Sequence, residues 1–326
     1  MMELSIVMNT KDEDRHVIDR TLKPLLEGIE GKDAEIIIND NSQYVKHFYD
    51  HHQIRHLRNQ KNIGVGGGFN KGVEHSRSEF LVLLGCDTVV QDDWYDRVLQ
   101  TLNDHPNTIF NAASSGFTHM SEPFRQPRAI RYGAHLLYKM TIDDLPTHSA
   151  LKKDKKFSRI LQGKWNPVEP DPGEELGAIT CLMGAFYWMH KSDYIKLRGW
   201  NHHKMWGSLE SWISIKARAH GMQLLVDKRL EAAHYFGREI VRPSRADYQY
   251  FNMLFIAHTM FHPEIAQELE YHLRYGGRET KIEKLQVNNA RVMLKRMGGA
   301  VKTERDYNNR HFKEGLIRDI RKFNIL

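Results

Sequence analysis

The chain has 326 residues, of which 40% are hydrophobic, and its formal net charge is +6. This length suits one large α/β domain with an appendage, or two domains, and the composition allows a substantial core. No apolar run reaches the roughly 18 residues that a membrane-spanning helix needs, and the start lacks the basic segment of a signal peptide. Two cysteines, Cys86 and Cys181, are too few for a disulfide framework or a cysteine metal site, so we expect a cytoplasmic protein.

The positive charge is concentrated at the carboxyl end. Residues 272–326 hold 14 Lys and Arg against 6 Asp and Glu, whereas the rest of the chain holds 33 against 35. Basic tails attract the phosphates of nucleic acids or of anionic lipids. A solvated helical face is the alternative interpretation of the same charges.

The amino-terminal part alternates short apolar runs with helical patterns. We expect strands at residues 4–8, 35–38, 54–57 and 80–84, and helices at residues 10–29, 67–76 and 92–102. Strands that alternate with helices predict an α/β fold with a mostly parallel central sheet flanked by helices.

Residues 118–177 break this alternation, because prolines and charges dominate them. We interpret the segment as an insertion, or lid, over the active site. Further strands are expected at residues 178–188, 224–226 and 232–236, and further helices at residues 192–197, 206–220, 248–261 and 263–275. We therefore expect one domain at residues 1–240 and a helical, basic carboxyl-terminal region at residues 241–326.

The most informative motif is a glycine-rich run in residues 62–72, followed by an apolar strand that ends at Asp87. A carboxylate at the carboxyl end of a buried strand lies where open α/β sheets bind ligands. The glycines by themselves also fit a tight loop.

Five blocks of the chain, taken in order, resemble glycosyltransferase family 2, whose members have the GT-A fold. They are residues 4–10, 35–42, 62–72, 83–90 and 184–221. The second block is similar to a strand with a D-[DN]-x-S turn, the third to N-x-G-x-x-x-x-x-N-x-G and the fourth to L-N-P-D-T-x-V. The resemblance implies an inverting, metal-assisted transfer of a sugar from a nucleotide sugar, UDP-linked, to an acceptor hydroxyl.

The resemblance also assigns the nucleotide-binding residues. It implies that Asp40 accepts a hydrogen bond from the base and that Asn70, Gly66 and Gly67 pack close to the nucleotide. Glycine suits such a position because a side chain would block close approach of the backbone. Spacing alone allows Asp40 to cap the next helix instead.

Asp87 corresponds to the metal-binding aspartate of the family's D-x-D motif. Such a carboxylate holds Mn²⁺ or Mg²⁺ against the two phosphates of the donor. Gly85 stands where a first acidic or amide residue is usual, so only one carboxylate remains. His234 occupies the place where related enzymes supply a histidine ligand, although a structural histidine also fits that position.

Glu210 is the candidate general base. The family carries an E-D pair before a helix, and here Leu209 replaces the first acid while Glu210 stands second. A glutamate in the first turn of a helix, favoured by the helix dipole, is the alternative interpretation. Residues 206–212 also resemble the W-G-G-E-N stretch of the polypeptide N-acetylgalactosaminyltransferases, which supports a hexosyl or pentosyl donor.

The resemblance leaves the acceptor open. A cell-envelope glycan is the first interpretation, with the basic tail touching an anionic membrane surface. A bacteriophage-type enzyme that glycosylates hydroxymethylated DNA bases is the second, because the same tail could bind DNA phosphates. A catalytically inactive nucleotide-binding scaffold is the third, because two acidic positions of the family pattern are missing.

Overall fold

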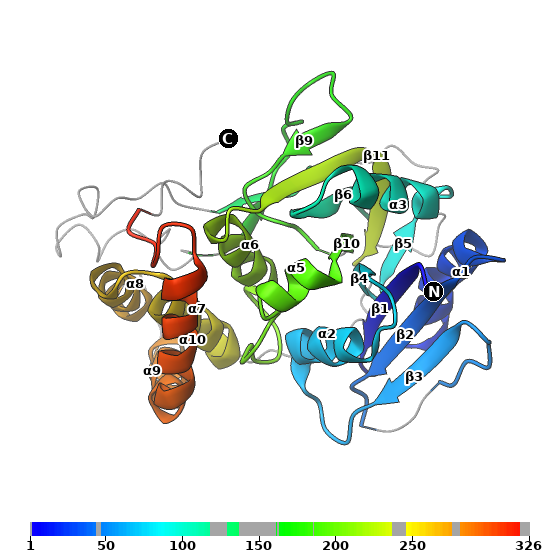
Figure 1. The fold of residues 1–326 in the computed structure, drawn as a ribbon. Coiled ribbons are helices and arrows are strands. Elements are labelled where there is room, and N and C mark those ends of the chain that lie inside the picture. Colours follow the sequence, from blue (N-terminus) through cyan, green and yellow to red (C-terminus); the bar gives the residue numbers. More distant parts are fainter. Residues whose placement is uncertain are drawn as a thin grey trace.

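The computed structural model describes residues 2–43, 47–117, 129–136, 161, 163–184, 186–236, 246–275 and 281–319. A central sheet carries helices on both faces, and helices α7 to α10 lie together on one side of it (Figure 1). Most of the expected insertion, at residues 118–128, 137–160 and 162, lies outside the described residues. Within the described ranges, every helix is too short or too polar to cross a bilayer.

The strands of the main sheet are β1 (Leu4–Thr10), β2 (Ala34–Asp40), β3 (Ile54–Arg58), β4 (Phe80–Gly85), β5 (Thr88–Val90), β6 (Thr108–Phe117), β9 (Leu176–Ala178), β10 (Phe186–His190) and β11 (Gln223–Tyr235). A small second sheet pairs β7 (Ala134–Leu136) with β8 (Gly163–Trp165). The helices are α1 (Arg15–Ile29), α2 (Gly64–His75), α3 (Trp94–Asp104), α5 (Lys191–Lys196), α6 (Leu209–Ala219), α7 (Ala246–Met260), α8 (Pro263–Tyr275), α9 (Lys281–Arg296) and α10 (Gly298–His311).

Within the described residues the main sheet has nine strands, in the order β3-β2-β1-β4-β10-β6-β11-β5, with β9 also on β11. Strands β3, β2, β1 and β4 are parallel, whereas β10 runs antiparallel between β4 and β6. The predicted α/β class, with a central sheet between helices and a helical carboxyl-terminal region, is confirmed.

Three strand predictions need correction. Strand β6 was not predicted, because its small and polar residues, such as Asn111, Ser114 and Ser115, are weak strand formers. The single strand expected at residues 178–188 is replaced by two strands, β9 and β10, which pair with different neighbours in the sheet. The two short strands expected near residue 230 form one long strand, β11, that continues through a bulge.

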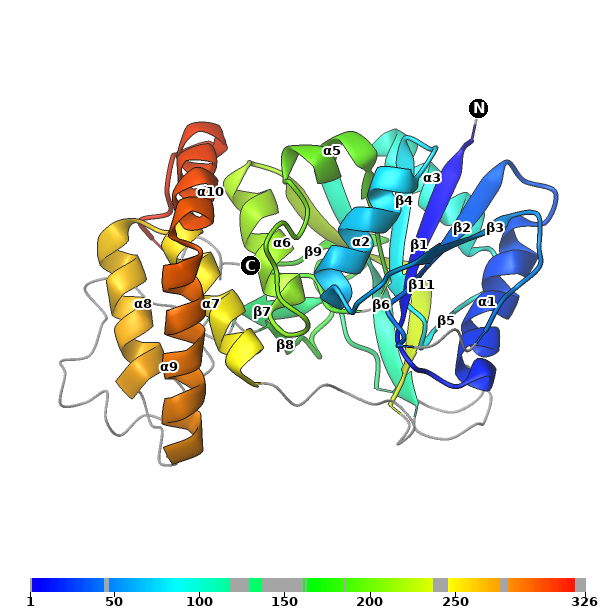
Figure 2. The ribbon, with the colours of Figure 1, turned by 90° about the horizontal axis from the view of Figure 1, so that it is seen from below.

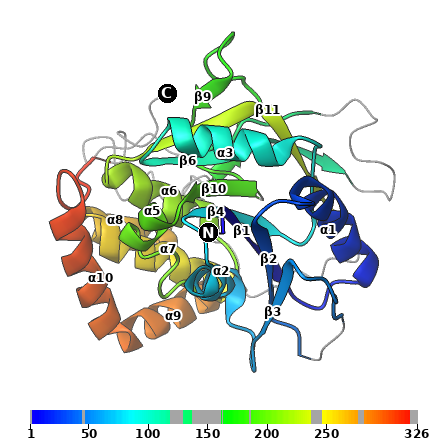
Figure 3. The same ribbon diagram turned by 45° about the vertical axis from the view of Figure 1, so that its right-hand side comes forward.

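The side chains of β1 alternate between the two faces of the sheet, and this alternation explains why helices pack on both faces. Leu4, Ile6 and Met8 face one hydrophobic cluster, which includes residues of α1 and α3. Val7 faces the other, which includes residues of α2, α5 and α6. Figure 3 shows these two groups of helices on opposite faces of the sheet. Side chains alternate between the faces of a strand, so β1 is buried against helices on both of its faces.

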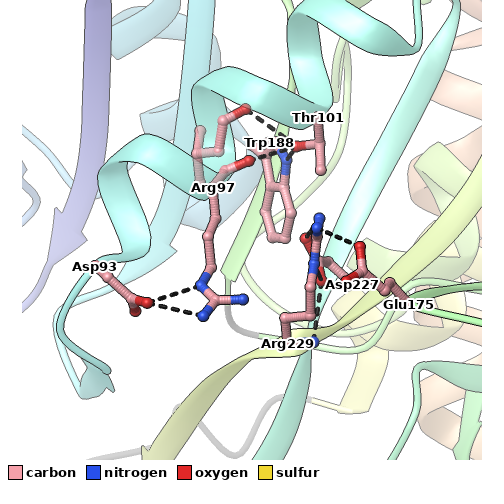
Figure 4. Close-up of polar contacts among 8 residues, drawn as sticks. Asp93, Arg97, Thr101, Glu175, Trp188, Asp227 and Arg229 are labelled. Carbon is pink, nitrogen blue, oxygen red and sulfur yellow. Dashed lines mark hydrogen bonds and ion pairs between the residues drawn. The ribbon is translucent and has the colours of Figure 1, made fainter.

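Polar contacts link residues of β10 and β11 to their neighbours (Figure 4). The indole Nε1 of Trp188 on β10 donates to Oγ1 of Thr101 on α3 at 2.7 Å. In the bulge of β11, Arg229 binds the buried carboxylate of Asp227 at 2.8 Å and also contacts Glu175. The bulge shifts the register of β11 on β6 between Asp227 and Glu231. Beyond it, β11 pairs with β5 at the site described below.

The carboxyl-terminal helices share their core with the sheet domain. One hydrophobic cluster runs from Val7 on β1 through α6 to α7, where Phe255 stacks on Trp212 with ring centroids 5.1 Å apart. A buried ion pair adds a second connection, because Nζ of Lys216 on α6 lies 2.5 Å from Oε1 of Glu304 on α10. Arg198 contacts the other oxygen of Glu304 at 3.1 Å. The domain boundary expected at residue 240 therefore separates two segments whose side chains share one hydrophobic core.

Replacing Glu304 by alanine should lower the free energy of unfolding by about 3–5 kcal/mol, because Lys216 would remain buried without a counter-ion. Urea denaturation measures this effect. Asp306→Ala, on the exposed side of the same helix, is the matched control and should change stability little. The double variant Lys216→Met/Glu304→Leu should recover most of the loss. Equal midpoints for Glu304→Ala and the wild type would contradict this account of the pair.

Candidate functional site

A cavity of about 430 Å³ lies at the carboxyl ends of β1 and β4. Three predicted site residues, Asp87, Glu210 and His234, line it together. They come from three distant segments: the turn after β4, the first turn of α6 and the end of β11. The cavity is therefore the candidate functional site, at the edge of the sheet where ligands of open α/β folds bind.

The backbone around Asp87 is held from both sides. Thr21 on α1 donates its hydroxyl to the carbonyl of Cys86 at 2.6 Å and accepts the N–H of Thr88 at 3.2 Å. The N–H of Tyr235 donates to the carbonyl of Asp87 at 2.8 Å. These bonds fix the turn that presents the Asp87 carboxylate to the cavity.

Strand pairing brings His234 to Asp87. Strand β11 is antiparallel to β5, and His234 lies opposite Thr88 in that register. Its Nε2 lies 3.3 Å from Oδ2 of Asp87, and both side chains are largely buried. The ring of Phe236 packs against the imidazole, with centroids 4.4 Å apart. The two residues that the sequence predicts as metal ligands are thus neighbours.

This pair could hold a divalent cation only with additional ligands. A carboxylate oxygen and an imidazole nitrogen suit Mn²⁺ or Mg²⁺ coordination. Across the described part of the chain, no group of three His, Cys, Asp or Glu side chains gathers closely enough to hold a metal. Gly85 lines the cavity without a side chain that could ligate. The donor set of Asp87 and His234 fits a cation whose other ligands come from a bound diphosphate and water.

Glu13 is a cavity residue that the sequence analysis did not single out. We expected residues 10–29 to form one helix, but α1 begins at Arg15, and Glu13 lies in the loop before it. Its carboxylate accepts hydrogen bonds from Oγ1 of Thr10 and from the N–H of Lys11. Burial raises the pKa of Glu13, and the nearby Asp87 acts in the same direction. The sequence signal that could have identified Glu13 was an acidic residue shortly after the first strand.

Glu210 faces the cavity from the first turn of α6. Burial raises the pKa of its carboxyl group, whereas a hydrogen bond from Tyr187 lowers it in part. The Tyr187 hydroxyl donates to Oε1 at 3.3 Å, and burial keeps the pKa of that phenol well above its usual range. Gly184 leaves room for the carboxylate, since a Cβ there would lie 3.0 Å from Oε1. The contact with Tyr187 therefore fixes the position of the Glu210 carboxyl group, and its raised pKa favours proton exchange.

The glycine-rich run forms the first turns of α2, which begins at Gly64, earlier than predicted. A Cβ on Gly66 would lie 2.6 Å from Cβ of Trp200, and one on Gly68 would lie 2.1 Å from Oδ1 of Asn9. Gly67 is less tightly packed, with Ile63 at 3.2 Å. Only Gly64 of these glycines is among the cavity-lining residues. The glycines thus allow α2 to pack closely on its neighbours.

Asn70 and Asp40, predicted to contact the nucleotide, are not among the lining residues. The side-chain oxygen of Asn70 accepts the hydroxyl of Tyr194 at 2.6 Å and the N–H of Trp200 at 3.0 Å. Oδ1 of Asp40 accepts the N–H of Ser42 at 2.8 Å, in the turn after β2. In this arrangement both side chains stabilise local structure, so their nucleotide-binding roles stay predictions.

A network of asparagines, also not anticipated, borders the cavity. Nδ2 of Asn39 donates to Asn9 at 3.1 Å, and Nδ2 of Asn59 donates to Asn39 and Asn41 at 3.1 and 3.0 Å. Asn9 also donates to the carbonyl of Val65 at 3.0 Å. The network ties the carboxyl ends of β1 and β2 to the start of α2. Asn9 and Asn41 themselves line the cavity.

Aromatic side chains form another part of the lining. They are Trp165 from β8, Trp206 from the loop before α6, and Phe236 after β11. Trp206 is 46% exposed and Phe236 is 39% exposed. Exposed aromatic faces beside polar groups are suited to stacking on flat, amphipathic ligands.

The carboxyl-terminal region contributes directly to the site. Gln249 of α7 lines the cavity. The buried Asn252 of α7 accepts the N–H of Lys204 at 2.8 Å and donates to the carbonyls of Lys204 and Gly207 at 2.9 and 3.0 Å. These bonds hold the loop that carries Trp206 and leads into α6. Sequence reasoning assigned no site residue to this region, because its residues are far from every motif.

Comparisons with known proteins indicate a family and a fold. Residues 5–160 match the family described as Glycosyl transferase family 2. Among curated proteins, none matches the sequence significantly. A crystal structure of GalNAc-T7 with UDP, GalNAc and Mn²⁺ is similar at a TM-score of 0.58 and 13% identity. The alignment covers 83% of this chain and 55% of that one, so the chain spans about half the length of that protein.

A second solved structure, residues 1–349 of TarS from S. aureus, aligns at a TM-score of 0.47 and 12% identity, over 91% of this chain and 74% of that one. The GalNAc-T7 alignment shows the fold, which is that of the GT-A glycosyltransferases. The match over residues 5–160 shows that this part of the chain is similar to glycosyl transferase family 2, in agreement with the fold.

Proposed function

We propose that the protein transfers a sugar from a UDP-sugar to an acceptor hydroxyl with inversion. The observation that carries the proposal is the meeting of Asp87, His234 and Glu210 around one cavity. A candidate cation site and a candidate base are the two groups that such a transfer needs. The UDP and Mn²⁺ in the similar GalNAc-T7 structure support the choice of donor and cation.

The donor diphosphate is placed beside Asp87 and His234. A bound Mn²⁺ or Mg²⁺ neutralises the charge that develops on the leaving diphosphate. Asp87 and His234 would ligate it, and the hydrogen bonds from Thr21 and Tyr235 keep the Asp87 turn in place. Lys11, whose ammonium group lies 2.9 Å from the Asp12 carboxylate, also lines the cavity. The chain thus orients the leaving group before the reaction.

Glu210 acts as the general base. It takes the proton of the acceptor hydroxyl while the acceptor oxygen forms its bond to the anomeric carbon and the bond to the diphosphate oxygen breaks. Attack from the face opposite the leaving group inverts the anomeric centre. The raised pKa of Glu210 suits a base, because the ionised form of a group with a higher pKa accepts a proton more readily. Tyr187, which keeps its proton, orients the carboxylate.

We propose a cell-envelope glycan as the acceptor. The aromatic lining of Trp165, Trp206 and Phe236 offers faces for sugar rings beside the base. DNA with hydroxymethylated bases is the second candidate, supported by the basic carboxyl-terminal region. An inactive scaffold is less favoured, since it would not need Glu210 in the same cavity as the Asp87–His234 pair. The two cysteines are free and buried, which is consistent with a cytoplasmic setting.

A screen of UDP-sugars against free or lipid-linked saccharides and against hydroxymethylated DNA tests this proposal. Product detected with a saccharide acceptor supports the first candidate, and product detected on DNA replaces it with the second. UDP binding without turnover on any acceptor or on water would favour the scaffold.

Asp87→Ala should abolish transfer and weaken UDP binding in Mn²⁺, because the only carboxylate of the ligand pair is removed. Calorimetric titration with UDP, with and without the metal, measures this effect. Asp92→Ala, an exposed aspartate five residues further on, should behave as the wild type. Full activity of the wild type in excess chelator would remove the cation from the proposal.

Glu210→Gln should leave UDP affinity nearly unchanged and lower kcat by roughly 10² or more, the usual effect of losing a positioned base. The base works only when ionised, so kcat/KM of the wild type should fall as the pH drops through the raised pKa of Glu210. This acidic limb should lie at higher pH than for an exposed glutamate, and the variant should lack it. Turnover within a few-fold of the wild type would assign the base elsewhere.

Asn252→Ala should lower kcat by about tenfold with little change in UDP affinity, because the loop before Glu210 loses three hydrogen bonds of about 1 kcal/mol each. Steady-state kinetics and a UDP titration separate the two effects. Thr303→Ala, on the exposed side of α10, is the control. A loss confined to thermal stability, with kcat retained at low temperature, would restrict Asn252 to folding.

A further inference from the structure

The outer face of α9 exposes aliphatic side chains that the fold does not use. Ile282, Leu285 and Val292 are 68%, 59% and 50% exposed. Leu285 and Val292 are seven residues apart, so they lie on the same side of the helix, and Ile282 lies one turn before Leu285. The opposite side of α9 is buried through Val287 and Ala290 against the other carboxyl-terminal helices.

Basic side chains flank this apolar row. Lys284, Lys295 and Arg296 are all exposed. At 100° per residue, Lys284 and Lys295 fall on one side of the row, whereas Arg296 falls within the row, one turn beyond Val292. Arg291, by contrast, points inward and binds Glu270 at 2.5 Å. We use "outer face of α9" for these six residues: Ile282, Leu285, Val292, Lys284, Lys295 and Arg296.

The orientation of α9 relates this face to the site. Figure 2 shows the amino-terminal end of α9 on the same side of the molecule as the carboxyl end of β1. The cavity opens among the residues that follow β1 and β4.

We propose that the outer face of α9 binds an anionic membrane surface. Aliphatic side chains enter the boundary between head groups and acyl chains, while flanking lysines and arginines contact anionic head groups. Charge complementarity distinguishes this partner from a second copy of the chain, whose outer face would carry the same positive charge. Duplex DNA would use the basic side chains but would leave Leu285 and Val292 against a phosphate backbone. The proposal concerns binding alone, so it does not depend on the activity proposed above.

The test is co-sedimentation of the full-length protein with vesicles. We expect binding to vesicles of phosphatidylcholine with about 30% phosphatidylglycerol at low salt, and much weaker binding to phosphatidylcholine alone. Leu285→Ser/Val292→Ser should lower the partition coefficient by about tenfold, by loss of apolar insertion. Lys284→Gln/Lys295→Gln/Arg296→Gln should lower it by about tenfold or more, because each charge near an anionic surface contributes.

Matched controls remove the same groups elsewhere. Ile195→Ser replaces an aliphatic residue that is 60% exposed on α5, and Lys23→Gln replaces an exposed lysine on α1. Both should bind vesicles as the wild type does, and thermal unfolding of every variant checks the fold. Three results would overturn the proposal: no binding to anionic vesicles, binding that the α9 variants leave unchanged, or dimerisation in sedimentation velocity that Leu285→Ser/Val292→Ser abolishes. Binding to duplex DNA that depends on the charges but not on Leu285 would reassign the face to nucleic acid.

Discussion

The site depends on the buried asparagine side chains where β1 and β2 end. A buried amide that lacks a partner costs about 1–3 kcal/mol, so each must be paired. Asn9, Asn39 and Asn59 pair with one another and with Asn41, and Asn9 also holds the carbonyl of Val65. The first turns of α2 can approach these amides only because Gly68 has no side chain. The asparagine network and the space left by Gly68 therefore act together to position the first turns of α2, which form one wall of the cavity.

Strand register provides the second constraint. Asp87 and His234 are far apart in the chain, and their contact arises from the antiparallel pairing of β5 with β11. On its other side β11 pairs with β6, where a bulge between Asp227 and Glu231 shifts the register. A shift of one residue in the pairing with β5 would turn His234 to the other face of the sheet. The candidate cation site thus depends on the register of β5 and β11.

The carboxyl-terminal helices support the site through their buried side chains, and their other side chains face solvent. Inside, Asn252 holds the loop before Glu210, and Glu304 neutralises the buried Lys216. Outside, α9 presents Leu285 and Val292 among basic side chains. The helices share one hydrophobic core with the sheet domain, so the two sets of residues belong to one packed unit.

The sequence by itself determined the alternation of strands and helices, because apolar periodicity follows directly from burial on two faces of a sheet. The resemblance to glycosyltransferase family 2 singled out Asp87, His234 and Glu210, and for Asp87 the end of an apolar strand gave the same indication. Asp40 and Asn70 were singled out in the same way, yet the tertiary structure engages their side chains with Ser42 and with Tyr194. Strand β6 escaped notice because small polar residues form a strand there only when neighbouring strands supply their hydrogen bonds. Tertiary structure alone decided that Glu13 enters the cavity, that Asn252 supports the loop before Glu210, and that His234 meets Asp87. Those contacts join segments distant in the chain, and only the register of the sheet and the packing of the helices bring such segments together.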